Sequence, residues 1–367
     1  MKRIGVGLVG ASTMHPGWAI DAHVPALRAL PQYELVAVST SRRASAMAAA
    51  EALSVVAFDN HQELVSHPSV DVVVVTVKVT DHFAVVSTAL AAGKAVYCEW
   101  PLGNGLAEAV ELSDLASKAG VRTAIGLQSR FSPVVRHIRA LIGAGYVGKV
   151  LSSSIVGSGI AWGPKSDRNH AYMFDAANGA TALSIPTLHA LDAVAFAVGD
   201  FATVSAHLGR GRKTVELDDG TTIPVTAPDQ IAIVGQLTND ATVSVFYRGG
   251  VSRGSNLHWE INGTEGDLVV TSAIGNVQVA DLKLRGGRAE HTAVEDIAVP
   301  RDDYDHLNGS AANVARLYAQ LARDIEDGFA TTPDFMEGVR RHRLLAAIDA
   351  AAPLSVRVPA ATRSALS

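Results

Sequence analysis

Residues 4–18 read IGVGLVGASTMHPGW, and this stretch indicates the class of fold. The near-continuous apolar run of its first six residues is typical of a strand buried on both faces, and the Gly- and Pro-containing residues after it predict a turn. The G-x-G-x-x-G pattern is matched by Gly5, Gly7 and Gly10, but the first two fall inside the strand. A phosphate cradle needs its glycines in the turn, where backbone N–H groups point at the ligand.

The turn after this strand is therefore the predicted cradle for a dinucleotide. Gly10 makes the tight turn, Ser12 takes the slot that is usually glycine, and Gly17 permits a close approach of the backbone. An ordinary strand-to-helix loop is the alternative. The residues of this turn that we predict to bind the cofactor are Gly10, Ser12, Thr13, Gly17 and Trp18.

The first third of the chain alternates short apolar strands with Ala-rich helices. Two of the helical segments end on a glycine, Gly93 and Gly120, as helices commonly do. Such alternation predicts βαβ units in a doubly wound parallel sheet, so the fold class of this part is α/β. The predicted strands are 4–9, 34–39, 72–77 and 95–99, and the predicted helices are 19–30, 45–52, 81–92 and 106–119.

After about residue 150 the pattern changes to strands joined by turn signals such as Asn239-Asp240 and Gly249-Gly250. Successive hairpins predict an open antiparallel sheet that carries helices, which is an α+β domain. The predicted strands are 151–156, 202–208, 231–237, 242–247, 257–262, 267–271 and 277–280, and the predicted helices are 180–198, 308–327 and 334–351. We place a dinucleotide-binding domain at 1–128, a substrate and oligomerisation domain at 129–353, whose last helices could pack back on the first, and a tail at 354–367.

Composition excludes several classes of protein. Hydrophobic residues make up 48% of the chain and charged residues 18%, which excludes disorder as the main state. The net charge of −5 means that there is no excess of basic residues for direct nucleic-acid binding. The longest apolar run contains charged residues, so no membrane span is expected. Cys98 is the one cysteine, and no His/Asp/Glu cluster has ligand spacing, so we expect a cytoplasmic protein without a metal site.

The end of the second strand bears on the choice of cofactor. An acid normally stands there to hold the ribose 2′-hydroxyl of NAD, but this chain has Ser39-Thr40-Ser41-Arg42-Arg43. Hydroxyl and guanidinium groups suit a 2′-phosphate, so the cofactor is NADP or NAD, with NADP slightly favoured and with Ser41 and Arg42 as its contacts. The alternative is that the arginines only cap a solvated helix start.

Six motifs then occur in order along the chain. They are residues 23–27 (HVPAL), 71–77 (DVVVVTV) followed by His82, 89–102 (ALAAGKAVYCEWPL), 130–133 (RFSP), 145–150 (GYVGKV) and 263–268 (GTEGDL). Together they resemble the Gfo/Idh/MocA family of NAD(P)-dependent sugar and cyclitol oxidoreductases, from residue 4 to about residue 350. The resemblance implies a Rossmann domain, then an open antiparallel sheet with the substrate site and commonly a subunit interface, so a homo-oligomer (dimer or tetramer) is expected.

One branch of that family is closer in motif. Residues 17–20 (GWAI), Glu99-Trp100, 129–133 (SRFSP) and 172–179 (YMFDAANG) are similar to the branch that contains the fungal repressor of the galactose genes. That repressor is a non-catalytic member that binds a dinucleotide.

Two residues depart from the family's catalytic pattern. Family enzymes typically carry Glu-Lys-Pro where this chain has Glu99-Trp100-Pro101, and indole N–H has no useful acid or base role near neutrality. The aspartate often found four residues before the catalytic histidine is replaced by Ile185, while His189 is kept. Two of the three usual catalytic side chains are therefore absent.

The resemblance assigns expected roles to the remaining residues. His189 is the candidate general base, against the alternative of a core histidine, and Tyr172 is a weaker candidate that could donate to a sugar hydroxyl. Trp100 either stacks on the nicotinamide or a sugar face or fills the space of the missing lysine, and Arg130 either binds substrate or locks the domain interface. The other predicted cofactor contacts are Val77, His82, Glu99, Trp100 and Gln128, and the predicted substrate contacts are Trp100, Arg130, Tyr172, Asp175 and His189.

Three functional hypotheses follow. The first is an oxidoreductase that transfers a hydride between NAD(P) and a sugar, polyol or related alcohol. The second is a non-catalytic NAD(P)-binding sensor that acts through a protein partner. The third is redox-assisted elimination or glycoside cleavage with bound NAD.

Overall fold

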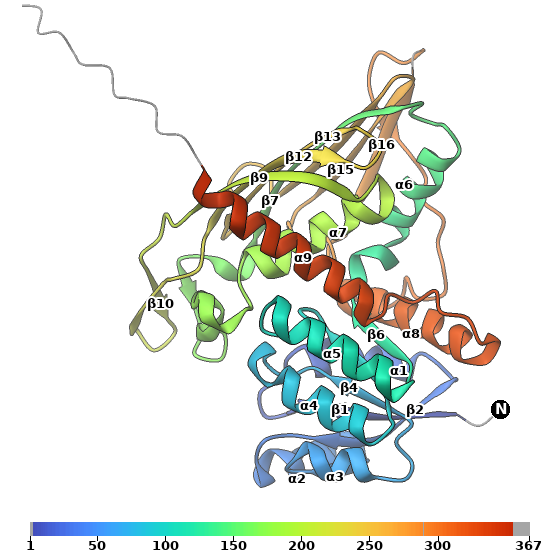
Figure 1. Ribbon diagram of the computed structural model, residues 1–367, viewed down its shortest axis with the longest axis vertical. Coiled ribbons are helices and arrows are strands. Elements are labelled where there is room, and N and C mark those ends of the chain that lie inside the picture. Colours follow the sequence, from blue (N-terminus) through green and yellow to red (C-terminus); the bar gives the residue numbers. More distant parts are fainter. Residues whose placement is uncertain (1–2, 289, 355–367) are drawn as a thin grey trace, which may run out of the picture.

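The computed structural model describes residues 3–288 and 290–354. These residues form a six-stranded sheet flanked by helices and a larger, eight-stranded sheet above it, with the long helix α9 (Phe335–Ala351) running diagonally between the two (Figure 1). The predicted boundary between residues 128 and 129 stays a prediction, and the predicted tail, apart from Leu354, lies outside the described residues.

The first sheet is wholly parallel, with strand order β3-β2-β1-β4-β5-β6. The direction of winding reverses beside β1, which is where open α/β sheets bind nucleotides at the carboxyl ends of their strands. This confirms the predicted doubly wound sheet. Its strands are β1 (Ile4–Val9), β2 (Tyr33–Ser39), β3 (Val56–Phe58), β4 (Val72–Val75), β5 (Ala95–Glu99) and β6 (Thr123–Gly126).

Both faces of this sheet are buried, because side chains alternate between them along each strand. On β4, Val73 and Val75 join one apolar cluster while Val72 and Val74 join the other. The second cluster is completed by Leu317 and its neighbours on α8 (Gly309–Asp327), so a helix from late in the sequence covers the early sheet. The other helices of this part are η1 (Ala19–His23), α1 (Val24–Arg28), α2 (Arg43–Leu53), α3 (His61–Ser66), α4 (Val79–Ala91) and α5 (Leu106–Ala119).

The larger sheet has the order β17-β16-β15-β14-β7-β13-β12-β9. Its neighbours pair antiparallel, as predicted, except for β7 and β13, which form one parallel pair within the sheet. The reason is that β7, the first strand to enter, lies in the middle rather than at an edge. The strands are β7 (Val150–Gly159), β9 (Phe201–Gly209), β12 (Gln230–Leu237), β13 (Thr242–Gly249), β14 (Leu257–Gly263), β15 (Gly266–Ser272), β16 (Lys283–Arg288) and β17 (Glu295–Asp296).

Three further elements matter to the site. A small sheet joins β8 (Lys165–Ser166), β10 (Thr214–Leu217) and β11 (Thr222–Pro224). The turn η2 (Gln128–Phe131) and helix α6 (Pro133–Gly143) connect the two large sheets.

Three predicted elements differ. The single helix expected over 19–30 is divided into η1 (Ala19–His23) and α1 (Val24–Arg28). The single helix expected over 180–198 is divided into η6 (Leu183–Thr187), which contains Pro186, and α7 (Leu188–Ala197). The strand expected over 277–280 is a turn, because the N–H groups of Val279 and Ala280 both donate to the Asn276 carbonyl.

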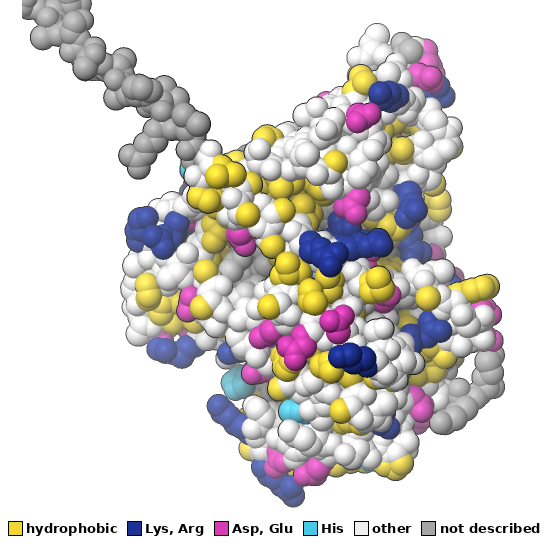
Figure 2. Space-filling view, in the orientation of Figure 1, with side chains coloured by type: hydrophobic (Ala, Val, Ile, Leu, Met, Phe, Trp, Pro, Cys, Tyr) yellow, Lys and Arg dark blue, Asp and Glu magenta, His cyan; other side chains and the backbone are white. Residues whose placement is uncertain are grey.

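Surface features complete the fold. Hydrophobic side chains gather where α9 runs beside β9 (Figure 2), and Phe201, Val204 and Leu344 line the groove there. On the large sheet, Val234 and Phe246 are 54% and 37% exposed. Among the described helices none has the length and apolar character needed to cross a membrane.

Candidate functional site

A long groove of about 950 Å³ lies at the carboxyl ends of β1, β2 and β4. At its centre Gly10 has φ +98°, and its N–H donates to the Ser39 carbonyl over 2.9 Å. A Cβ at this position would lie 2.9 Å from the Thr76 hydroxyl oxygen and 3.1 Å from the Thr76 backbone. The chain therefore requires glycine at the tight turn.

The other glycines of residues 4–18 lie either inside β1 or in the turn that follows it. Gly5 and Gly7 lie inside β1, and added Cβ atoms would collide with the Ser69 carbonyl oxygen and with the Leu64 side chain. They serve strand packing. Gly17 has open space around the position of a Cβ. Ser12 lines the groove, whereas Thr13 and Gly17 are not among its lining residues.

The far end of the groove holds the residues predicted to choose between NAD and NADP. Arg42 stands at the N-cap of α2 and also lines the groove with Ser41. Its carbonyl accepts hydrogen bonds from the Thr40 hydroxyl (3.0 Å) and the Ser45 hydroxyl (2.9 Å). A carboxylate that the sequence reading missed, Asp59, lines the same end because it follows β3, the strand beside β2.

A second cavity, of about 200 Å³, adjoins the groove at Thr76 and Val77, and we call it the indole cavity. Three of the chain's four tryptophans line it. Two of them, Trp18 and Trp100, come from the first part of the chain and Trp162 from the second, so the cavity lies between the two sheets. Its other polar or aromatic lining residues include His82, Glu99, Gln128, Tyr172, His189 and Gln278.

Buried polar atoms without a partner concentrate in the indole cavity. Among the described residues nine buried side-chain nitrogen or oxygen atoms have no hydrogen-bond partner, and four of the nine belong to residues that line it. Two are indole donors, one is an imidazole nitrogen and one is an amide oxygen, and such atoms cost free energy unless a ligand or water satisfies them. They are Trp18 Nε1, Trp162 Nε1, His189 Nδ1 and Gln278 Oε1.

Glu99 is the carboxylate of the indole cavity. It accepts hydrogen bonds from Gln128 Nε2 over 2.8 and 2.6 Å, and His23 Nε2 lies 3.0 Å away. Burial alone would raise its pKa, but the hydrogen bond and charge of His23, together with Gln128, hold the pKa of Glu99 below its usual range. His23 is in turn positioned by the Tyr318 hydroxyl at 2.8 Å, so α8 helps to orient this carboxylate.

His189 lies on α7 and is 4% exposed. Burial lowers its pKa to about 4, although Asp192 and Glu99 oppose the shift, so its ring is neutral near pH 7. Tyr172 is partly buried, burial raises its pKa, and the Lys78 ammonium lies 4.7 Å from its ring centre.

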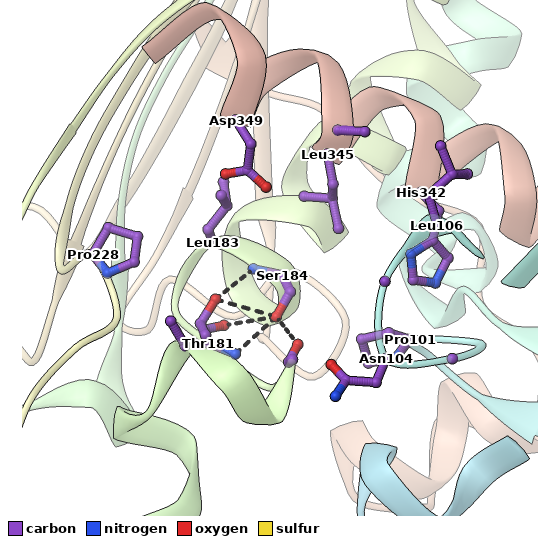
Figure 3. A pocket seen from close by; sticks show the side chains of 15 residues that line it. Pro101, Asn104, Leu106, Thr181, Leu183, Ser184, Pro228, His342, Leu345 and Asp349 are labelled. Carbon is purple, nitrogen blue, oxygen red and sulfur yellow. Dashed lines mark hydrogen bonds between the residues drawn. The ribbon is translucent and has the colours of Figure 1, made fainter. Parts of the chain in front are cut away.

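Contacts with η6 and α9 hold the Trp100 side chain in place. Its indole N–H donates to the Ser184 carbonyl over 2.7 Å, and its ring packs against His342 with 4.6 Å between ring centres. Ser184 and Thr181 bond one another around the turn before α7, as the dashed lines of Figure 3 show. Figure 3 also shows His342 pointing from α9 toward the loop that carries Pro101, beside a separate cavity of about 230 Å³.

His82 joins two loops rather than contacting solvent. Its ring nitrogens lie 2.8 Å from the Pro101 carbonyl oxygen and 3.1 Å from that of Val77, and burial lowers its pKa. It therefore fixes the loop after β5 to the end of β4, at the junction of groove and cavity.

Two predicted substrate residues lie elsewhere. Arg130 donates to Asp192 (2.7–3.1 Å) and to Glu337 (2.5 Å), so its guanidinium joins η2, α7 and α9, which favours the interface alternative; its substrate role stays a prediction. Asp175 caps η5 (Ala176–Asn178) and accepts from the Thr226 hydroxyl, outside the indole cavity, because the chain turns away there.

The sequence reading missed Trp162 and Gln278. Trp162 ends the short helix η3 (Ile160–Trp162) before β8, and Gln278 lies in a turn before β16. No motif or periodicity marks a functional residue in either segment. Among residues 3–288 and 290–354 no group of three His, Cys, Asp or Glu side chains is placed to hold a metal ion.

The fold, with its groove at the switch point and adjoining cavity, is that of a protein with an NAD-binding Rossmann fold followed by a larger sheet with helices. Residues 4–127 match the family model for the oxidoreductase family with an NAD-binding Rossmann fold, and residues 133–272 match the model for the Gal80p C-terminal domain. The chain is 32% identical over 288 residues to the dehydrogenase aclE of Aspergillus oryzae, covering 73% of this chain and 76% of that protein. It belongs to the Gfo/Idh/MocA oxidoreductase family.

Relatives of two kinds match along most of the chain. The galactose/lactose metabolism regulatory protein GAL80 of Saccharomyces cerevisiae is 28% identical over 87% of this chain and 82% of its own. A crystal structure of a super-repressor mutant of that protein has the same fold, with a TM-score of 0.88 at 24% identity over 98% of this chain and 99% of that one. The 1,5-anhydro-D-fructose reductase of Ensifer adhaerens is 28% identical over 88% of this chain and 91% of its own.

Proposed function

We propose that this chain is an NAD(P)-dependent oxidoreductase that transfers a hydride between the cofactor and a carbinol carbon of a sugar or polyol. The observation that carries the proposal is the indole cavity: three tryptophans and four unpartnered polar atoms belong to residues that line a space next to the nucleotide groove. Flat aromatic faces and fixed donors and acceptors are what a ring bearing several hydroxyls requires. The reductase from Ensifer adhaerens is a sugar-directed relative.

The groove and the indole cavity fit a dinucleotide together. Gly10 permits the tight turn at the groove, since a Cβ there would collide with Thr76, and the groove and the indole cavity share Thr76 and Val77 in their linings. The adenosine half would then lie near Arg42 and the nicotinamide ring near Trp100. When bound, the nicotinamide would accept or supply the hydride. Trp18, Trp100 and Trp162 would exclude water from that space.

His189 is the proposed base. Its neutral imidazole can take the proton of a substrate hydroxyl as the carbon–hydrogen bond is broken, and a positioned base contributes roughly 10²–10⁴ in rate. No lysine or arginine among the described residues lines the indole cavity, so the charge that the family lysine supplies has no replacement there. We expect slow turnover, or a substrate whose hydroxyl is already acidic.

NADP is the proposed preference. Ser41 and Arg42 line the groove at its ribose end, and the end of β2 offers no acid. Asp59 is the feature in favour of NAD. Dissociation constants for NADPH and NADH decide between them: we expect tighter NADPH binding that Arg42→Ala reduces by tenfold or more, whereas equal or tighter NADH binding would refute the preference.

Activity is tested with the full chain, NADP⁺ or NAD⁺, and a panel of sugars, cyclitols and sugar alcohols, followed by the absorbance of the reduced nicotinamide. We expect turnover that His189→Gln reduces at least 100-fold while cofactor affinity is kept. His207→Gln, an exposed imidazole on β9, is the matched control. Turnover that is unaffected by His189→Gln would refute the assigned base.

A regulatory role is the second candidate. The similarity to GAL80 favours it, as does Trp100 in place of the family lysine. Saturable cofactor binding without turnover on any member of the panel would support it over the enzyme.

We further propose a cytoplasmic homo-oligomer that pairs through the exposed face of the large sheet. Val156, Val234 and Phe246 present apolar surface there, and sedimentation of the purified chain measures the assembly. A strictly monomeric chain would refute it.

A further inference from the structure

A separate cavity of about 230 Å³ lies between α9, the loop after β5 and the residues before α7, and we call it the α9 cavity (Figure 3). It shares no lining residue with the nucleotide groove or with the indole cavity. Apolar side chains make up much of its wall, among them Leu106, Leu183, Pro228 and Leu345. The α9 cavity is therefore a space of its own, outside the site of the proposed reaction.

His342 places a buried polar atom at the Pro101 end of the α9 cavity (Figure 3). The residue is 3% exposed, and its Nε2 has no hydrogen-bond partner. Because burial lowers its pKa to about 4, the ring is neutral near pH 7, and Nε2 donates or accepts according to the tautomer. Such an atom costs free energy unless a ligand or water satisfies it, so His342 indicates a ligand with a hydroxyl group.

Asp349 provides the carboxylate of the α9 cavity. It lies seven residues after His342, on the same face of α9 as Leu345, and Figure 3 shows its side chain directed toward Leu183. Seven residues are two helical turns, so the two polar groups lie about 10 Å apart along the helix axis. Burial raises the pKa of the Asp349 carboxyl, which a cation beside it would lower.

The basic side chains around the α9 cavity belong to other sites. Arg340 and Arg343 line the groove between α9 and β9, and Arg212 pairs with Asp229 over 3.0 Å. Lys78 lines the nucleotide groove. The described residues that line the α9 cavity include no lysine or arginine, so its one carboxylate is available to a cationic ligand.

From these observations we infer that the α9 cavity is a second binding site, which takes a small amphipathic amine. The ammonium group pairs with Asp349, the apolar body packs between Leu183 and Leu345, and a hydroxyl at the far end bonds to His342 Nε2. The cavity volume of about 230 Å³ and the two-turn spacing fit a molecule with one six-membered ring and a short alkyl chain. The inference goes beyond the proposed function, since neither cofactor nor substrate is assigned to this cavity.

The α9 cavity also adjoins the contacts that hold Trp100. The His342 ring packs against that indole with 4.6 Å between ring centres, and the carbonyl of Ser184, another lining residue, accepts its N–H. A ligand that bonds to His342 would therefore restrain Trp100 from the side opposite the indole cavity.

Binding to the full chain, saturated with NADPH to occupy the nucleotide groove, tests the inference by isothermal titration calorimetry. The probes are tyramine, phenethylamine, which lacks the hydroxyl, 4-ethylphenol, which lacks the amine, and 3-(4-hydroxyphenyl)propionate, which replaces the ammonium by a carboxylate. We expect tyramine to bind at least tenfold more tightly than each of the other three. A carboxylate probe that binds as tightly as tyramine, or no saturable binding by any of the four, would overturn the inference.

Variants assign the binding to the α9 cavity. Asp349→Asn should weaken tyramine at least tenfold and leave 4-ethylphenol unchanged, whereas Asp327→Asn, an exposed aspartate at the end of α8, removes the same charge and should change neither. His342→Phe keeps a ring against Trp100 and should make tyramine and phenethylamine equal in affinity; retained phenethylamine binding shows that the cavity is intact. Tyramine affinity that Asp349→Asn leaves unchanged would place the amine elsewhere and refute the site.

Discussion

Among single residues, Gly10 matters most to the nucleotide groove. It lies between the first strand and the first helix, and its backbone is left-handed. Gly10 has φ +98° and is packed against Thr76, whose hydroxyl donates to the Val9 carbonyl over 2.6 Å. Gly17, at the other end of the same turn, has ordinary space around it. Replacing each of these glycines by alanine therefore adds the same methyl group to a crowded position and to an open one.

Gly10→Ala is expected to lower the free energy of unfolding by about 1–3 kcal/mol, because alanine resists positive φ and its methyl group collides with Thr76. It should also abolish cofactor binding. Gly17→Ala is the matched control and should leave stability nearly unchanged. Urea denaturation measures both, and equal effects of the two substitutions would refute the assignment of the turn.

Among the helices and turns, charged side chains hold three segments in place around the site. Asp192 on α7 is fully buried, accepts hydrogen bonds from Nε and Nη2 of Arg130, and lies 3.6 Å from Arg341 Nε on α9. Glu337 on α9 contacts both arginines. Since His189 is on the same helix as Asp192, this network positions the candidate base.

Asp192→Asn should destabilise the chain by about 3–5 kcal/mol, because it leaves the buried guanidinium of Arg341 and the partly buried one of Arg130 with less than their compensating charge. Asp296→Asn makes the same change in an exposed pair with Arg285 and is expected to have no measurable effect. Thermal unfolding of the two variants tests this. If Asp192→Asn does not change the unfolding temperature, α7 is held by apolar packing alone.

Secondary structure was predictable from the sequence where periodicity or composition was strong. The strand from Ile4 to Val9 and the two late helices lie within a residue of their predicted limits. Short elements were not predicted: β3 has only three residues, and the apolar run of residues 55–58 that contains it is too short to stand out from the helices on either side. The order of the strands was not predicted from the sequence either, because the parallel pairing of β7 with β13 depends on partners more than 80 residues apart.

Across the whole molecule, the site is formed by the meeting of distant segments. Trp18, Glu99, Trp162, His189 and Gln278 come from five separate stretches of chain. Family motifs point to the early ones, whereas Trp162 and Gln278 follow from the tertiary fold alone. The same meeting buries imidazole rings away from water, so the stability of the chain should depend on pH.

Burial lowers the pKa of both His189 and His342 to about 4. The unfolded chain takes up protons on these rings below about pH 6.5, whereas the folded chain does so only near pH 4. The free energy of unfolding should therefore fall on acidification between these values, by up to about 3 kcal/mol for each ring. Below the folded pKa no further loss arises from them.

His342→Gln should reduce the dependence of the unfolding free energy on pH between about 4.5 and 6 by about 1.4 kcal/mol per pH unit. His207→Gln, exposed on β9, is the control and should leave the slope unchanged. Urea titrations across this pH range give the slopes. A slope that His342→Gln does not alter would show that this ring titrates normally in the folded chain.

If the groove at the end of β1 and the indole cavity form one site, a bound nicotinamide ring lies beside three tryptophans. Energy transfer from tryptophan to the reduced nicotinamide, followed as NADPH or NADH is titrated into the full chain, measures this proximity. We predict saturable quenching of tryptophan emission with matching sensitised nicotinamide emission, both lost in Gly10→Ala. The absence of saturable transfer with both reduced coenzymes would contradict a shared site.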